Sequence, residues 1–351
     1  MSSKQQALAP RITAATALGL ALLTAPLLEA TAAELALPPI TVGAGVRTSF
    51  TSTDYEGSGS DVSDFALNSA RIYISGKVTD TISLMFNTEY DGSGIEPIDA
   101  VAQFAFSDQL NIWAGRFLAP SDRANMYGPY YASNWGVFVD GVQDGYPFVT
   151  QGRSDGVMYW GQFGKTKVSV GAFDNATPNT TNDLVYAGRM QFDFWDPEGG
   201  YYLNGSYYGA KDLLALGLAA QTSDGDSAYT ADLLFEKKLS GGGVVTLEAE
   251  YAKYDGLGGY GLAAESDGYY GIAAYLFPQV VGIGKFQVLA KYGTATHEAV
   301  GGDIDWDTLE LNLNYIIKDQ AARIQLFFLD RDSTVIGADY RQFGIGLQIQ
   351  M

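Results

Sequence analysis

The sequence contains no cysteine and a single histidine, His297, among 351 residues. These absences exclude a thiolate metal site, a disulfide framework, a cysteine nucleophile and a c-type haem attachment site. Charged residues are also scarce, at 17% of the chain, and acidic residues outnumber basic residues by 40 to 21. Nucleic acid is not expected as a partner, because its phosphates would be repelled by such an acidic chain.

Long apolar runs are absent from most of the chain. After residue 33, no stretch reaches the roughly twenty apolar residues that a membrane-spanning helix needs. At the start, Lys4 and Arg11 precede the apolar stretch ITAATALGLALLTAPLL, and small residues follow it. This arrangement is typical of a secretory signal peptide, so we expect residues 1–33 to be cleaved and residues 34–351 to form the mature domain. An N-terminal membrane anchor is the alternative, which the modest length disfavours.

What the sequence does contain is a regular alternation of apolar and polar residues. The segment ARIYISGKVTDTISLMFNTEYDG, residues 70–92, shows two such runs joined by a short turn. Successive side chains of a strand point to opposite faces, so this ribbon has an apolar face and a polar face. The apolar face holds Ile72, Ile74, Ile82, Leu84 and Phe86, and the polar face holds Arg71, Ser75, Lys77, Ser83, Asn87 and Glu89. We expect lipid against the first face and a wet interior against the second.

About sixteen such strands are expected between residue 40 and the C-terminus, each long enough to cross a bilayer when tilted. Short turns alternate with longer loops rich in Gly, Asp, Asn and Ser, such as 293–305. Residues 195–211 are interpreted as one long periplasmic turn, because a single-chain bacterial barrel needs an even number of strands. The sequence thus predicts an all-β fold, a transmembrane antiparallel β-barrel. Interfacial aromatic girdles are expected at Phe50, Tyr90, Phe106, Phe117, Phe163, Phe173, Trp195, Tyr254, Phe277, Tyr292 and Trp306.

The segments ARIYISGKVTDTISLMFNTEYDG and IDAVAQFAFSDQLNIWAGRFLAPSDR resemble the N-terminal half of the phosphate-selective porins O and P. The resemblance implies a sixteen-stranded, trimeric porin in the outer membrane of a Gram-negative bacterium, in contact with lipid and lipopolysaccharide. It also implies that the long third loop folds inward. Phosphate selectivity in that family depends on basic residues around the constriction, and this loop region offers only Arg123 and Arg153. Phosphate selectivity is therefore not inferred.

Residues 119–152 form the longest connection, and loops beyond about fifteen residues are uncommon unless they have a function. One interpretation is a constriction loop on the inner wall of the barrel, and the other is an external cap or a subunit contact. The candidate constriction residues are Asp122, Arg123, Tyr127, Tyr130, Tyr131, Trp135, Asp140, Asp144 and Arg153.

Candidate pore-wall residues occupy inward positions of the strands. They are Arg71, Lys77, Lys167, Glu248, Glu250, Glu310, Asn312 and Arg323. The basic members lie on separate strands, whereas Asp122, Asp140 and Asp144 share one loop. The signal peptide carries two of the 21 basic and one of the 40 acidic residues, so the mature chain has a net charge of −20. We therefore expect a weak preference for cations that falls as salt rises.

The expected function is a porin for passive diffusion of small hydrophilic solutes and ions. No nucleophile elbow or P-loop is present, so we expect no enzyme activity, no metal and no cofactor. His297 is interpreted as a solvated loop residue, because no second His or Cys accompanies it. Three alternatives stay open: an anion- or phosphate-selective porin, a barrel sheath for a separate redox partner, and a secreted soluble β-protein that binds carbohydrate.

Overall fold

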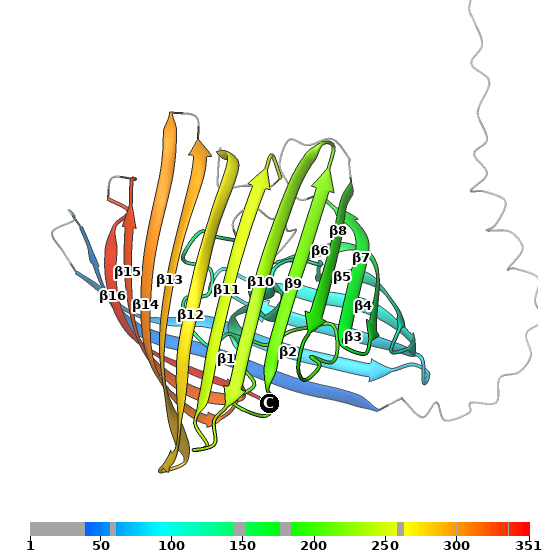
Figure 1. Cartoon of the computed structure of the whole chain (residues 1–351), viewed down its shortest axis with the longest axis horizontal. Helices are drawn as coiled ribbons and strands as arrows, with labels where there is room; N and C mark the ends of the chain where they lie inside the picture. The colour runs from blue at the N-terminus through cyan, green and yellow to red at the C-terminus, as the bar shows by residue number, and fades with distance from the viewer. Residues whose placement is uncertain are drawn as a thin grey trace, which may run out of the picture. The chain divides into compact units, whose positions relative to one another are not determined.

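The computed structural model describes residues 39–56, 61–143, 152–175, 184–257, 263–299, 301–335 and 337–351. Sixteen antiparallel strands in these ranges form one closed barrel (Figure 1), in which β1 pairs with β16. The strands are β1 (Ile40–Tyr55), β2 (Val62–Lys77), β3 (Ile82–Tyr90), β4 (Ile95–Ser107), β5 (Leu110–Leu118), β6 (Arg153–Phe163), β7 (Thr166–Asp174), β8 (Leu184–Asp193), β9 (Leu213–Ser223), β10 (Asp226–Lys238), β11 (Val244–Asp255), β12 (Ala263–Val281), β13 (Gly284–Ala299), β14 (Gly302–Lys318), β15 (Ala322–Ser333) and β16 (Tyr340–Gln350). The predicted barrel of about sixteen strands is confirmed. The predicted signal peptide, residues 1–33, and Asp144 lie outside the described residues.

The alternation along the strands places apolar side chains outside the barrel and polar side chains inside it. In β14, Leu311 is 44% exposed, whereas Glu310 and Asn312 beside it are 0% and 5% exposed. In the β2–β3 hairpin, Ile72 and Leu84 are likewise exposed. A continuous apolar outer surface of this kind suits hydrocarbon and would drive association in water. The secreted soluble β-protein is therefore disfavoured.

The two ends of the barrel differ in their connections. Both ends of the described chain lie at the end with the short turns, where Ile40 pairs with Gly76 and Gly45 pairs with Gln350. Residues 194–212 contain no strand, which agrees with the predicted long turn between β8 and β9. No helix in the described ranges is long and apolar enough to cross a membrane.

The predicted loop at 293–305 is wrong. β13 and β14 remain paired through this region, where His297 lies opposite Ile304. His297 is therefore a strand residue, fully buried, with its Nδ1 2.9 Å from Ser266 Oγ and its ring against Trp306. The interpretation of His297 as a solvated loop residue is also wrong. The sequence signal that was missed is the alternation itself, which continues through the Thr- and Asp-rich stretch.

Part of the interior is a packed apolar core rather than a wet space. Trp113 and Phe117 of β5 point inward and pack edge to face, and Phe117 packs in turn on Phe173 of β7. Phe117, Phe173, Tyr254 and Trp306 are all buried, so the prediction that these four belong to the outer girdles is wrong. Their positions fall on the inward face of their strands. The apolar residues on both faces of β5 are explained by this core, because the strand contacts lipid outside and protein inside.

Candidate functional site

The described part of the longest connection, residues 119–143, lies inside the barrel and is called the inner loop. After β5 it forms the short helix α1 (Arg123–Tyr131), seen behind β10–β12 in Figure 1. The helix begins at Asp122, whose side chain accepts a hydrogen bond from the Asn125 N–H at 2.8 Å. Gly128, with φ +62°, interrupts the helical conformation just before Pro129, a geometry that favours glycine. The chain then crosses towards β13–β15.

The far wall of the barrel holds the inner loop in place. The carboxylate of Glu310 accepts hydrogen bonds from the N–H groups of Trp135 and Gly136, at 2.8 and 3.1 Å. Trp135 also stacks on Phe327, with ring centroids 5.3 Å apart. Further contacts to the wall join Tyr127 to Glu248 at 2.7 Å, Asp140 to Lys291 at 2.6 Å, Gln143 to Glu250 at 3.0 Å, and the Arg323 guanidinium to the Ala132 carbonyl. These wall groups bind the loop and are buried.

A second segment enters the barrel from the opposite end. Residues 195–212, here called the inner turn, connect β8 to β9 and contact the inner loop directly. The N–H groups of Leu203 and Gly205 donate to the Met126 and Tyr131 carbonyls, at 3.3 and 3.0 Å. A Cβ on Gly205 would lie 3.2 Å from the backbone of the inner loop, so the close approach depends on glycine at this position. The two inner segments therefore form one packed body within the lumen.

A buried ion network joins both inner segments to the wall. The Arg123 guanidinium lies 2.5 Å from the Glu198 carboxylate of the inner turn and 3.4 Å from Asp232 of β10. Arg189 of β8 also binds Asp232, at 2.5 Å, and donates to the Ser121 carbonyl at 3.0 Å. Arg123, Glu198 and Asp232 are fully buried. Such charges are tolerated in a dry site only because each has a partner.

Burial and a neighbouring positive charge shift the pKa values of carboxyl groups in the inner segments in opposite directions. Burial raises the pKa of Asp122 to about 6, although the hydrogen bonds from Asn125 oppose the shift. Burial also acts to raise the pKa of Glu198, but the neighbouring Arg123 guanidinium outweighs it and the net pKa is lowered. Glu198 is therefore held as the anion, whereas Asp122 is close to neutral in mildly acidic solution.

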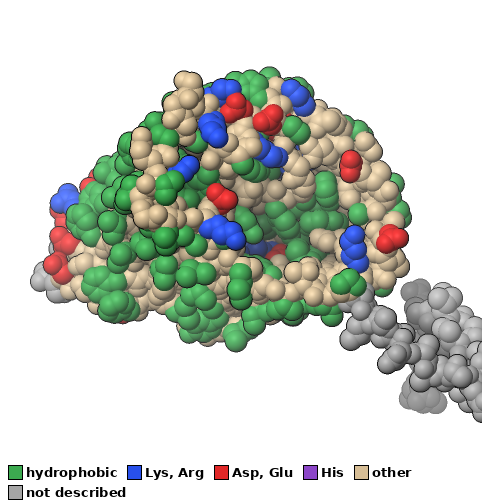
Figure 2. Space-filling model, turned by 90° about the horizontal axis from the view of Figure 1, so that it is seen from below, with side chains coloured by type: hydrophobic (Ala, Val, Ile, Leu, Met, Phe, Trp, Pro, Cys, Tyr) green, Lys and Arg blue, Asp and Glu red, His purple; other side chains and the backbone are tan. Residues whose placement is uncertain are grey.

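The inner segments leave space beside the wall formed by β1–β6. A cavity of about 470 Å³ lies on the short-turn side, with Thr41, Ser75 and Met351 in its lining. A second cavity of about 400 Å³ lies on the long-loop side. Arg71 and Arg153 line both cavities, so the two spaces adjoin at these side chains. Figure 2, which views the barrel from below, shows a hollow near its centre with charged side chains inside.

The charges beside the two cavities are arranged in pairs along the β1–β6 wall. Arg71 binds Glu89 at 2.9 Å, and Arg153 binds Asp99 at 3.3 Å. The Arg71 guanidinium also lies over the Tyr130 ring, 4.5 Å from its centroid. In the same way Arg47 covers the Trp135 ring of the inner loop, at 4.2 Å. The wall is therefore nearly balanced in charge where it faces the inner loop.

The structure brings some of the predicted site residues to the cavities and buries others. Arg71, Tyr127, Tyr131 and Arg153 are among the cavity linings. Asp122, Arg123 and Asp140 are fully buried and face neither cavity, which corrects the expectation that these charges line an open lumen. Lys167, Glu248, Glu250, Glu310, Asn312 and Arg323 point inward as predicted but are covered by the inner segments, and Lys77 is exposed at the short-turn end.

Sequence reasoning missed Tyr73, Asp99 and Tyr202, which also line the first cavity. Asp99 sits on the inward face of β4, so the alternation alone could have identified it. Tyr202 comes from the stretch YYLNGSYYG, whose aromatic density is unusual for a turn and was the available signal. Among the described residues, no group of three or more His, Cys, Asp or Glu side chains could hold a metal ion.

Neither a protein-family model nor a curated protein matches the sequence. Solved structures do resemble the barrel. The anion-selective porin from Comamonas acidovorans aligns with a TM-score of 0.58 at 12% identity, over 89% of this chain and 99% of that chain. OmpF of Salmonella typhi, in complex with daunomycin, gives 0.57 at 12% identity, over 90% and 98%. OmpTdeltaL8, a loop-deletion mutant of an outer membrane protein of Vibrio cholerae, gives 0.57 at 14% identity, over 90% and 100%.

The fold is that of outer-membrane porins. At 12–14% identity, the similarity establishes the architecture and does not carry over a solute or an ion preference. The specific resemblance to the phosphate-selective porins O and P stays a prediction, because it depends on the two motif segments alone.

Proposed function

We propose that the protein is an outer-membrane porin through which small hydrophilic solutes and ions diffuse passively. The observation that carries the proposal is the pair of adjoining cavities inside a closed barrel whose outer surface is apolar. The passage would run between the β1–β6 wall and the inner loop, narrowest where Arg71 and Arg153 approach that loop. The inner loop is then the constriction, and its buried charges serve to hold it rather than to contact the solute.

We also propose a weak preference for cations. The charged side chains beside the cavities are paired, so the preference would arise from exposed carboxylates at the long-loop mouth and not from the carboxylates of the inner loop. Exposed carboxylates there include Asp54, Glu56 and Asp91. With a mature net charge of −20, such a mouth attracts cations over about 8–10 Å at moderate salt.

The test is single-channel recording of the mature barrel in a planar bilayer. We expect discrete conductance steps and a small cation-selective reversal potential across a potassium chloride gradient. Asp91→Asn should reduce this potential, whereas Asp155→Asn, on the outer face beside Arg116, should leave it unchanged. No conductance steps would refute the porin, and clear chloride selectivity would move the anion-selective alternative to first place.

The redox-sheath alternative is disfavoured by the filling of the barrel. The inner loop and the inner turn occupy the space that a partner protein would need, and they are packed against each other and the wall. Assembly as a trimer, with lipid and lipopolysaccharide around it, is part of the proposal and follows from the resemblance to the porin family. Mobility on native gels before and after heating tests the oligomer.

A further inference from the structure

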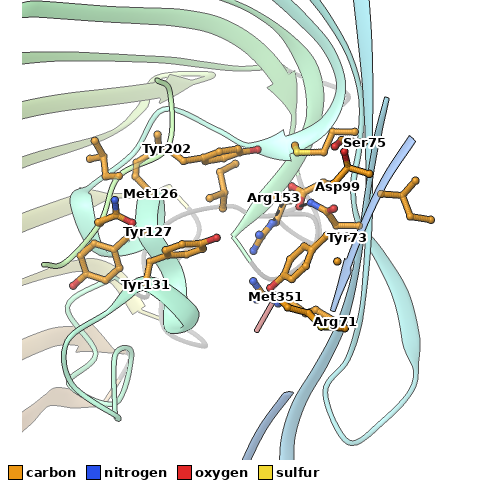
Figure 3. A pocket seen from close by; sticks show the side chains of 18 of the residues that line it. Arg71, Tyr73, Ser75, Asp99, Met126, Tyr127, Tyr131, Arg153, Tyr202 and Met351 are labelled. Carbon is orange, nitrogen blue, oxygen red and sulfur yellow. Dashed lines mark hydrogen bonds and ion pairs between the residues drawn. The ribbon is translucent and has the colours of Figure 1, made fainter. Parts of the chain in front are cut away.

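The 470 Å³ cavity, here called the chamber, has two walls of different chemistry (Figure 3). One wall comes from the barrel strands and combines apolar side chains such as Met85 with four polar or charged ones, Arg71, Asn87, Asp99 and Arg153. All four are more than nine-tenths buried. The facing wall consists of apolar and aromatic side chains from the two inner segments, namely Met126, Tyr131, Tyr202 and Leu203. A ligand in the chamber would therefore meet a polar edge on one side and a ring surface on the other.

The polar wall offers donors and acceptors, and each of its two guanidinium groups is paired with a carboxylate. Asp99 accepts a hydrogen bond from Asn87 at 2.8 Å and binds Arg153 at 3.3 Å, and Arg71 binds Glu89. The Nε of Arg71 is buried and has no hydrogen-bond partner. Because each guanidinium is next to a carboxylate, a free anion gains little here from charge alone. Neighbouring donors and acceptors of this kind match hydroxyl groups, which donate and accept at once.

The aromatic wall also contains an unsatisfied polar group. Tyr202 is an inner-turn residue whose hydroxyl is buried and has no hydrogen-bond partner. Figure 3 shows Tyr202 and Tyr131 on the α1 side of the chamber, opposite Tyr73 and Arg153. A buried hydroxyl without a partner costs about 1–3 kcal/mol, and a ligand hydroxyl placed beside it would remove that cost. The ring faces provide apolar surface for the C–H groups of the same ligand.

We propose that the chamber is a binding subsite for a small uncharged ring that carries hydroxyl groups, of the size of a monosaccharide. The inference rests on the proposed porin function and names the solute class for that passage. Volume supports it, because pockets of about 300–1,000 Å³ with apolar walls and a few fixed polar groups are the usual binding sites for small molecules. An aromatic carboxylate would use the rings but would need an uncompensated cation, which the paired wall does not supply.

The experiment uses the full barrel in planar bilayers with D-glucose, sorbitol or benzoate added. We expect glucose to reduce the ion current along a saturable curve. Sorbitol, an open-chain polyol, should give only the linear decrease that follows from viscosity. Saturable block by benzoate but not by glucose would overturn the proposal in favour of an anionic ligand, and linear curves for all three solutes would overturn it outright.

Variants of the aromatic wall show whether the block comes from the chamber. Tyr202→Phe keeps the ring and removes one hydrogen bond, so the half-blocking glucose concentration should rise about three- to tenfold. Tyr131→Leu should weaken the block as well, whereas Tyr229→Leu, on the outer surface, should not change it. Equal block in all three variants would contradict the subsite. If the wild type conducts no ions, saturable glucose binding in calorimetry of the detergent-folded barrel would support the subsite and refute only the porin.

Discussion

Arg123 shows how the barrel interior holds a charge that no water reaches. The guanidinium lies between Glu198 and Asp232, and all three side chains are fully buried. Arg123→Gln would leave the buried Glu198 carboxylate without its ion-pair partner, although Asp232 would keep Arg189, so we expect a loss of about 3–5 kcal/mol in the free energy of unfolding. The control is Arg116→Gln, which breaks a partly exposed pair with Asp155 and should cost about 1 kcal/mol or less. Urea midpoints of the detergent-folded variants measure both, and equal losses would contradict the assignment.

Asp122 gives the inner loop a dependence on pH. Its folded pKa of about 6 lies above the ordinary value of 3.8, so its contribution to stability is complete below about pH 4 and is lost as pH rises through 6. Asp122→Asn keeps an oxygen to cap α1 but cannot ionise. We expect this variant to have a higher urea midpoint than the wild type at pH 7.5 and a similar midpoint at pH 3.5. A difference that is the same at both pH values would rule out the ionisation of Asp122 as the cause.

The sequence identifies the charge of these residues but not their partners. The sequence predicts that Asp122 and Asp140 line the lumen, because they share the loop that is the candidate constriction. Each is instead buried, Asp140 against Lys291 of β13. A partner 151 positions away depends on the path of the whole loop, and nothing in the local sequence records that path. By contrast, the inward position of Glu310 follows from the alternation in its own strand.

The inner turn packs on the inner loop within the barrel, and Gly205 allows the close approach between them. A side chain at Gly205 would press on the backbone of residues 131–133. Gly205→Val should therefore push the inner turn away from α1 and raise the single-channel conductance, because overpacking forces the neighbours to move. Gly199→Val, where a Cβ meets nothing within 4 Å, is the matched control and should conduct like the wild type. Unchanged conductance in Gly205→Val would show that the inner turn does not bound the passage.

At the element scale, the strands could be predicted from their own residues, whereas the inward fold of the long third loop followed only from the family resemblance. A strand can be recognised within its own residues because apolar and polar side chains alternate with a period of two, as in residues 70–92. The length and aromatic content of 119–152 suggested a loop that packs on something, yet left the inside and the outside of the barrel as alternatives. Residues 195–211 were correctly interpreted as a turn, but their entry into the lumen depends on Leu203 and Gly205 meeting the inner loop. Contacts of this kind have no periodic signature.

At the scale of the whole molecule, the closed barrel has an apolar outer surface and a polar interior, so the cost of a new charge depends on the face that carries it. Leu311 faces outward on β14, and an arginine near the midplane of the bilayer costs about 2–4 kcal/mol. We expect Leu311→Arg to lower the temperature at which the barrel changes mobility in SDS. Ser75→Arg, which places the same charge beside the chamber, should have little effect. If the two variants unfold at the same temperature, the outer face is not in contact with lipid.

The contact between the inner loop and the inner turn also bears on the order of assembly. Arg123 and Glu198 are 75 positions apart, whereas the pairing of β1 with β16 that seals the cylinder joins Gly45 to Gln350 at opposite ends of the chain. Contacts between nearer residues lose less chain entropy and form earlier. We therefore expect the inner loop and the inner turn to pack together on a curved, open sheet before β1 pairs with β16. The Arg123–Glu198 pair then forms before the seam joins, so these side chains do not have to be inserted into a lumen that is already closed.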